Sequence, residues 1–253
     1  MTTIFAAFNA GVAKWWQDAL RCAVAFSKTK VIAVSDHDVG IGEWHDITPY
    51  LNQTQWYVKQ SRPYQFGRAW RLDIACQQRW IVVDRFIQEN RIEYPVFAPD
   101  WDVLIMHPLM DSFHYFKDCD FTCGGAAYHL NNDKVLPAYL KVVKDRLESR
   151  PQVSNSETVI CDMHLWPKVP LKRCALDVPF GTDLFDINVH LDQGCVVDPD
   201  IEYSGLNAKK LHWRDHKPYC TKADTGQELK LHWIHCWGAY KQKTGEICRQ
   251  ANA

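Results

Sequence analysis

The sequence lacks several features that would place it in a broad protein class. No apolar run approaches about 18 residues, so no membrane span is expected. The first residues, Met1–Phe8, lack the basic region and the long apolar segment of a secretory signal. Neither charge is in excess, because 29 Lys and Arg face 30 Asp and Glu, so no broad positive field would attract nucleic acid. These absences predict a soluble, cytoplasmic protein that does not bind nucleic acid.

The ten cysteines also lack a diagnostic spacing. No C-x-x-C pair occurs, and the nearest neighbours are Cys119 and Cys123. A structural zinc site usually has closely spaced ligand pairs, so this spacing argues against one. Reduced, mostly buried thiols are therefore expected.

What is present is an ordinary globular composition. Apolar residues make up 47% of the 253 residues and charged residues 23%, so nothing indicates disorder. A chain of this length can form one α/β domain around one core. No internal repeat or linker interrupts it. We expect a single domain over 1–253.

Hydrophobic periodicity indicates alternating strands and helices in the first half of the chain. Strands are expected at Thr3–Phe8, Val31–Ser35, Tyr94–Ala98 and Val103–Met106, and helices at Trp15–Phe26, around Leu72–Ile87 and around Leu136–Leu147, with irregular chain at Gly40–Gly67. The last third alternates short strand-like runs with loops. This order favours a Rossmann-like α/β fold whose central, mostly parallel sheet is flanked by helices and binds ligands at the carboxyl ends of its strands.

Two acids follow one of these strands at close spacing. Asp100 and Asp102 flank Trp101 between two apolar runs. In an extended segment, residues i and i+2 project to the same side, so the two carboxylates would converge. A hard divalent cation with oxygen ligands would relieve their repulsion and could bridge substrate phosphates. A solvated polar turn remains the alternative, because an isolated D-x-D triplet is common.

A second motif lies near the C-terminus. His235-Cys-Trp-Gly238-Ala-Tyr-Lys241 offers an imidazole, a glycine that permits close approach and a cation. An apolar strand that ends in D-x-D, followed late in the chain by H-x-x-G-x-x-K, resembles the GT-A glycosyltransferases, particularly the family-8 group of glycogenin and bacterial galactosyltransferases. The resemblance implies a single GT-A domain, with a nucleotide-binding half at about 1–106 and an acceptor-side half at about 107–253. In this domain Asp100, Asp102 and His235 would bind Mn²⁺ or Mg²⁺.

The same resemblance assigns further residues to the donor. Lys241 and the backbone near Gly238 would contact the diphosphate of a nucleotide sugar, most plausibly a UDP-sugar, beside Trp101. The loop that includes Ala6, Phe8 and Asn9 would hold the base and ribose. Arg71, before the long helix, would face phosphate or sugar, and Asp162, after Val159-Ile-Cys, is similar to the family's second acidic motif and becomes the candidate catalytic carboxylate. The acceptor would be a glycan, lipid or protein, which the loops do not specify.

Other functions stay open at this point. A metal-dependent hydrolase could use Asp36, His37 and Asp38 with His45 and Asp46. A nucleotidyltransferase would share the layered fold and the metal, but its Gly-rich triphosphate loop is only weakly matched at 9–14. A sugar-binding protein without enzymatic activity would explain the 11 Trp but not the clustered acids.

Overall fold

The computed structural model describes residues 1–8, 14–61, 70–124, 126–149, 165–176, 179–236 and 238–252, with the backbone alone at 70–73 and 239. The elements follow the chain in this order: β1 (Thr2–Ala7), α1 (Lys14–Phe26), β2 (Lys30–Ser35), β3 (Glu43–Asp46), α2 (Thr48–Asn52), α3 (Gln55–Ser61), α4 (Trp70–Asn90), β4 (Val96–Pro99), β5 (Val103–Ile105), α5 (Leu109–Ser112), η2 (Phe113–Tyr115), β6 (Phe121–Cys123), β7 (Ala127–Leu130), α6 (Val135–Glu148), η3 (Trp166–Lys168), β8 (Arg173–Ala175), β9 (Asp183–Leu184), β10 (Val197–Tyr203), β11 (Leu206–Lys209), β12 (His212–Arg214), β13 (Lys217–Thr221), β14 (Glu228–Leu231), β15 (Trp233–His235), η4 (Gly238–Lys243) and α8 (Thr244–Asn252). None of the described helices is long and apolar enough to cross a membrane.

The central sheet has seven strands in the order β3-β2-β1-β4-β7-β6-β8. Strands β3, β2, β1 and β4 run parallel, β7 is antiparallel to both of its neighbours, and β8 is parallel to β6. The sheet is therefore mixed but mostly parallel, as the alternation of strands and helices predicts. Because β1, β2 and β4 are parallel, their carboxyl ends lie at one edge, and the residues that follow them meet there.

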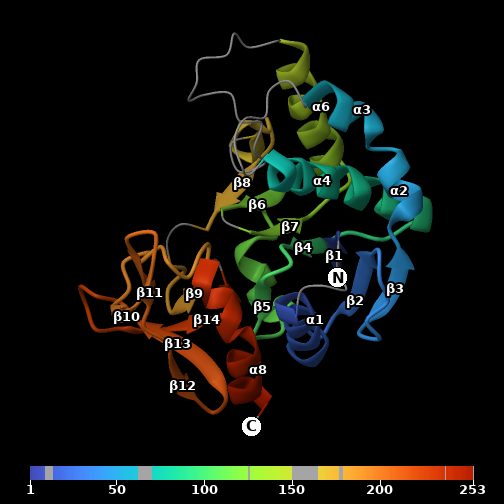
Figure 1. Ribbon diagram of the computed structural model, residues 1–253. Helices are drawn as coiled ribbons and strands as arrows, with labels where there is room; N and C mark the ends of the chain where they lie inside the picture. The colour runs from blue at the N-terminus through green and yellow to red at the C-terminus, as the bar shows by residue number, and fades with distance from the viewer. Residues whose placement is uncertain are drawn as a thin grey trace.

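Side chains along the inner strands point alternately to the two faces of this sheet, and each face carries a hydrophobic core. Phe5 and Ala7 of β1 pack in one core with α1, whereas Ile4 and Ala6 pack in the other with α4. Successive strand residues point to opposite faces, so a continuous apolar run is what a strand buried on both faces needs. Figure 1 shows α4 and α6 on one side of the sheet and α1 and α8 on the other.

The C-terminal strands form a smaller unit beside the sheet. Strands β12, β13, β14 and β9 make a four-stranded sheet, and β10 and β11 form a separate hairpin (Figure 1, orange to red). From this unit, β15 returns and pairs antiparallel with β5. The short β5-β15 ladder joins the C-terminal strands to the chain that follows β4.

The region from Gly40 to Gly67 differs from the irregular segment that the sequence predicts. Its described part, up to residue 61, contains edge strand β3 and two short helices, α2 and α3. Strand β3 reads Glu-Trp-His-Asp and is mostly exposed, so it carries no apolar alternation that would reveal it. It forms because β2 offers it a partner, and such pairing is not visible in local sequence.

The cysteines also differ from the expectation of reduced thiols. Two disulfides are present, Cys22–Cys248 between α1 and α8 and Cys119–Cys174 beside β6 and β8. Their partners are 226 and 55 residues apart in the chain. Pairing over such separations depends on the fold, because two cysteines bond only when their Cα atoms approach within about 7 Å.

Three of the buried histidines have lowered pKa values, and they make stability depend on pH. Burial lowers the pKa of His107 and of His129 to about 3, and burial also lowers the pKa of His232 despite its bond to Asp183. Below pH 6.5 the unfolded chain takes up protons that these imidazoles do not, so this stability is present above pH 6.5 and is lost progressively toward pH 3. The loss between pH 7.5 and 5.5 should be about 1 kcal/mol for each of His107 and His129, and His232 should add to it in the same direction.

Urea unfolding followed by tryptophan fluorescence at the two pH values would measure this loss. His129→Leu should reduce the pH dependence by the share of one imidazole, because neither ring nitrogen of His129 has a hydrogen-bond partner among the described residues. An unchanged pH dependence in His129→Leu would contradict the prediction.

Candidate functional site

The D-x-D segment lies in a turn between β4 and β5. Val103 donates its backbone N–H to the carbonyl oxygen of Asp100 at 3.3 Å, and Asp100 donates to that of Ala126 at 2.6 Å. The segment is therefore a turn, whereas we predicted an extended segment in which residues i and i+2 project to the same side. The turn nevertheless brings both carboxylates together, as predicted.

The third residue arrives through the β5-β15 ladder. Its register pairs His235 with Val103, and Cys236 donates its N–H to the carbonyl oxygen of Asp102 at 2.9 Å. An antiparallel pairing of two three-residue strands therefore brings the late motif beside the early one. Neither strand is long enough to show that pairing in its sequence.

Asp100, Asp102 and His235 each offer one ligand atom, and these atoms lie within 4.8 Å of one another. Of all the His, Cys, Asp and Glu side chains that the structure describes, these three form the only such group. Two carboxylate oxygens and an imidazole nitrogen are a donor set that suits Mn²⁺ or Mg²⁺. The residues present therefore fit a divalent cation.

Three basic groups balance the two carboxylates. Lys241 Nζ lies 2.8 Å from Asp102 Oδ2, His235 Nε2 lies 3.4 Å from Asp102 Oδ1, and the guanidinium of Arg79 forms an ion pair with Asp100. Burial opposes ionisation of Asp102, but His235 and Lys241 outweigh burial and lower its pKa. Burial also opposes the imidazolium of His235, but Asp102 raises its pKa above the usual value. The site is thus built to hold Asp102 as a carboxylate.

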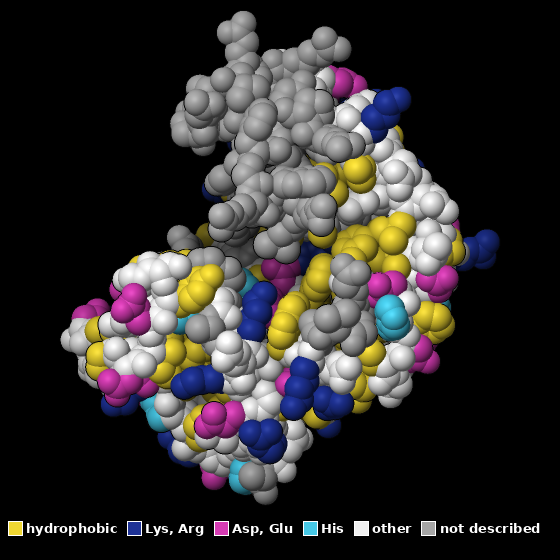
Figure 2. Space-filling view, in the orientation of Figure 1, with side chains coloured by type: hydrophobic (Ala, Val, Ile, Leu, Met, Phe, Trp, Pro, Cys, Tyr) yellow, Lys and Arg dark blue, Asp and Glu magenta, His cyan; other side chains and the backbone are white. Residues whose placement is uncertain are grey.

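Aromatic side chains stand beside these charges. The ring of Trp101 lies 6.4 Å from that of Trp15, with 17° between the planes, and 6.0 Å from that of Phe8. Lys241 Nζ sits 4.5 Å from the centre of the Trp15 ring. In Figure 2, acidic and basic side chains meet in the hollow between the C-terminal strands and the rest of the molecule. Flat apolar faces next to cationic groups suit a ligand that has both a ring and a phosphate.

The other predicted residues are only partly described. Ala6 is fully buried in β1 and Phe8 is partly buried at its end. Asn9 and Asp162 lie outside the described residues, and at Arg71 the structure describes only the backbone, within α4. Their roles in donor binding and catalysis stay predictions.

Gly238 begins η4 and contacts an aromatic ring. Its φ is +59°, and a Cβ at this position would lie 2.6 Å from Cδ1 of Tyr203. Gly181 has a similar φ, +63°, but nothing lies within 4 Å of its Cβ position. The two glycines therefore separate the cost of a left-handed backbone from the cost of a steric clash.

Gly238→Ala should lower the free energy of unfolding by about 2–4 kcal/mol, and Gly181→Ala by about 1 kcal/mol. The difference reflects the displacement of the Tyr203 ring. Urea titration of the two variants would measure both values. Equal losses would show that the contact with Tyr203 costs nothing to disturb.

Arg79 is a site residue that the sequence reading missed. Its side chain is 3% exposed, and its guanidinium lies 4.3 Å from the centre of the Trp80 ring. The position is three residues after Cys76 and four before Val83, so it belongs to the buried stripe of α4. The sequence shows only that Arg79 is a basic residue within an apolar stripe. The fold shows that it faces Asp100.

The alternative hydrolase site is not assembled. His37 contacts Asp36 at 3.3 Å, Asp38 accepts the N–H of Gly40 at 2.8 Å, and Asp46 accepts from Thr48 at 2.7 Å. These are contacts between near neighbours in the chain. In the described structure these side chains do not converge as a ligand group.

This chain resembles known proteins in structure but not in sequence. No protein-family model matches the chain, and no curated protein matches it in sequence. The galactosyltransferase LgtC, solved in complex with donor and acceptor sugar analogues, superposes with a TM-score of 0.50 at 11% identity, over 100% of this chain and 95% of LgtC. The glycosyltransferase GlyE of Streptococcus pneumoniae TIGR4, in its apo form, gives 0.40 at 12% identity over 70% of this chain.

The chain matches only 45% of the length of GlyE, whereas it matches nearly all of LgtC. Mouse xyloside xylosyltransferase 1 is a more distant neighbour, with a TM-score of 0.33 at 11% identity over 67% of this chain and 70% of that one. At these identities, the likeness to LgtC shows the fold alone. The chain has the GT-A glycosyltransferase fold: a mostly parallel central sheet flanked by helices, with its acidic turn at the carboxyl edge.

Proposed function

We propose that this protein is a metal-dependent glycosyltransferase that moves a sugar from a nucleotide-diphosphate sugar, most plausibly a UDP-sugar, to a carbohydrate-type acceptor. The observation that carries the proposal is the convergence of Asp100, Asp102 and His235 within 4.8 Å at the carboxyl edge of a GT-A sheet. LgtC, which shares the fold, was solved with donor and acceptor sugar analogues. That likeness supports sugar ligands for this site.

The two carboxylates and the imidazole would hold Mn²⁺ or Mg²⁺. When bound, the cation would supply Lewis-acid stabilisation of the diphosphate that leaves. Lys241 Nζ lies 2.8 Å from Asp102 Oδ2. It would donate to the same diphosphate and stabilise the charge that grows as the glycosidic C–O bond breaks.

The remaining residues would orient the donor. Phe8 and Trp101 offer faces for the nucleoside. Ala6, within β1, and Asn9 would belong to the same base and ribose site. The Gly238 backbone would approach the diphosphate, and Arg71 would face phosphate or sugar. Asp162 would be the active-site carboxylate that positions the sugar or acceptor. In this scheme residues up to about 106 bind the nucleotide, and the later residues supply the acceptor side and His235.

Thermal unfolding with nucleoside diphosphates would test the proposal. UDP, GDP, ADP and CDP would each be added with and without Mn²⁺. A ligand at 100 times its Kd stabilises the native state by about 2.7 kcal/mol, so UDP should raise the melting temperature only when Mn²⁺ is present. If no nucleotide shifts the melting temperature under either condition, the donor site is wrongly assigned.

A further inference from the structure

The segment that supports His235 has no regular secondary structure, although Phe185, Asp186 and Val189 in it are buried. Residues 185–189 lie between β9 and β10 and run beneath β15. Asp186 accepts two hydrogen bonds from β15: its carbonyl oxygen from the indole N–H of Trp233 at 2.9 Å, and its Oδ2 from the backbone N–H of His235 at 2.7 Å. Val189 donates to the carbonyl oxygen of His235 at 3.1 Å. Hydrogen bonds from this segment therefore fix the backbone of His235 on both its N–H and its carbonyl oxygen.

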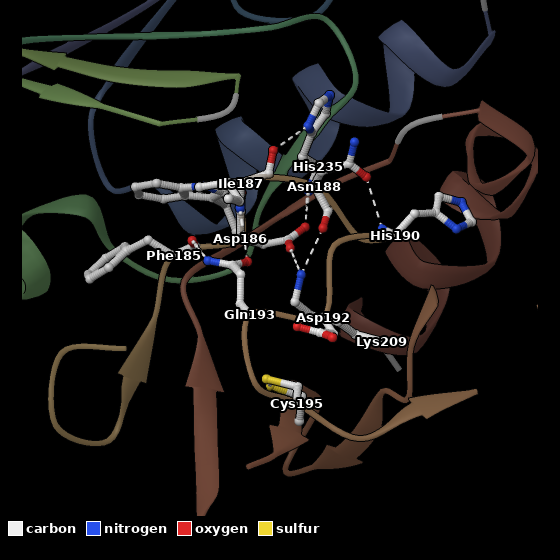
Figure 3. Close-up of polar contacts among 12 residues, drawn as sticks. Phe185, Asp186, Ile187, Asn188, His190, Asp192, Gln193, Cys195, Lys209 and His235 are labelled. Carbon is white, nitrogen blue, oxygen red and sulfur yellow. Dashed lines mark hydrogen bonds and ion pairs between the residues drawn. The ribbon is translucent and has the colours of Figure 1, made fainter. Parts of the chain in front are cut away.

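The same segment fixes the imidazole. Nδ1 of His235 lies 2.8 Å from the carbonyl oxygen of Ile187, as Figure 3 shows. A carbonyl oxygen can only accept, so Nδ1 carries the proton. The other nitrogen, Nε2, then faces Asp102 at 3.4 Å. In the neutral imidazole this leaves the Nε2 lone pair directed at the site where a cation would bind.

A buried ion pair holds this segment in place. Lys209 Nζ donates to Asp186 Oδ1 at 2.6 Å and to the carbonyl oxygen of Asn188 at 2.7 Å. The exposed fractions of the Lys209 and Asp186 side chains are 0% and 1%. Gln193 adds two bonds, because its amide donates to the carbonyl oxygen of Phe185 and accepts from the N–H of Ile187, both at 3.3 Å. Figure 3 shows these side chains gathered beneath His235.

A pair buried this completely is a costly way to stabilise a fold. Desolvation of two charges often offsets their attraction, so apolar residues of similar size would serve stability as well. One oxygen of Asp186 binds Lys209 and the other binds His235. The direction of both bonds fixes where β15 lies relative to Asp102.

We propose that Asp186 and Lys209 are positioning residues for the metal site, and that their ion pair sets its affinity for a divalent cation by fixing the position and tautomer of His235. This inference rests on the proposed function, because it takes His235 to be a metal ligand. Outer groups that orient a metal-binding histidine typically contribute 10- to 100-fold to metal affinity. Asp186 and Lys209 would do so from a different part of the chain than the ligands themselves.

The test is a titration with Mn²⁺ alone, in which electron paramagnetic resonance measures the free ion. Asp186→Asn combined with Lys209→Met removes both charges together, so no uncompensated charge is left in the core, and the Asn oxygen can still accept from His235. We expect this double variant to bind Mn²⁺ at least tenfold more weakly while it stays folded by circular dichroism. Asp186→Glu keeps both charges and shifts the carboxylate by one methylene; it should weaken Mn²⁺ binding in the same direction.

Asp183→Asn is the matched control. Asp183 binds His232 at 2.6 Å and Tyr115 at 2.7 Å in the same part of the molecule but makes no contact with His235. This variant should keep the Mn²⁺ affinity of the unmodified protein. Equal weakening in Asp183→Asn, or unchanged affinity in the double variant while His235→Ala weakens binding, would overturn the inference alone. Absence of Mn²⁺ binding to the unmodified protein would overturn the proposed function and the inference with it.

Discussion

Replacing Asp102 with Asn is expected to lower the rate of UDP release from a UDP-sugar at least about 100-fold in the presence of Mn²⁺. The amide removes one negative charge from the ligand set and presents a weaker oxygen donor. It also removes the partner of Lys241, which lies 2.8 Å from the Asp102 carboxylate. The measurement is UDP formation over time, with Mn²⁺ saturating for the unmodified protein.

Asp84→Asn is the matched control for this variant. Asp84 and Asp102 are both 5% exposed, and the chemical change is the same. The Asp84 carboxylate accepts from the side chain of Gln88 at 3.0 Å and is not part of the Asp100, Asp102 and His235 group. Its substitution should leave UDP release within about twofold, because it removes no metal ligand. If Asp102→Asn retains the full rate, Asp102 is not a ligand in the reaction.

Replacing Lys209 alone with Met is expected to lower the free energy of unfolding by about 3–5 kcal/mol. The reason is that the Asp186 carboxylate would remain buried without its partner, and the carbonyl oxygen of Asn188 would lose a donor. Adding Asp186→Asn should recover part of this loss, since the double variant leaves no uncompensated charge. Urea unfolding followed by tryptophan fluorescence would measure both effects.

Lys222→Met provides the comparison at the surface. Lys222 forms an ion pair with Asp224 at 3.3 Å, and the two side chains are 32% and 66% exposed. Exposed pairs contribute about 0–1 kcal/mol, so this substitution should change stability little. A loss for Lys209→Met as small as that for Lys222→Met would show that the buried pair does not hold its segment.

The first half of the fold could be predicted because its elements are apolar and long enough to show their period. Helix α1 and strand β2 appear within one residue of their expected bounds. Strand β3 was missed, since it is short, polar and defined by its partner. The disulfide between Cys22 and Cys248 was missed for a related reason, because only the folded chain brings α1 and α8 together.

The candidate metal ligands could be predicted from the sequence, but the residues that hold them in place could not. Asp100, Asp102 and His235 belong to two motifs whose residue types and order carry the resemblance, and the structure brings them together. Arg79 lies among uncharged residues in α4, and Lys209 is followed directly by Lys210, so nothing in the local sequence marks either residue as part of a site. Their partners, Asp100 and Asp186, lie in other parts of the chain, so their roles depend on tertiary contacts that the local sequence does not predict.

The most direct measurement is a crystal structure with Mn²⁺ and UDP, using diffraction data collected at the manganese absorption edge. We expect one anomalous peak between the carboxylates of Asp100 and Asp102 and Nε2 of His235, with the UDP diphosphate beside it. A peak elsewhere, or bound UDP with no peak at these three residues, would contradict it.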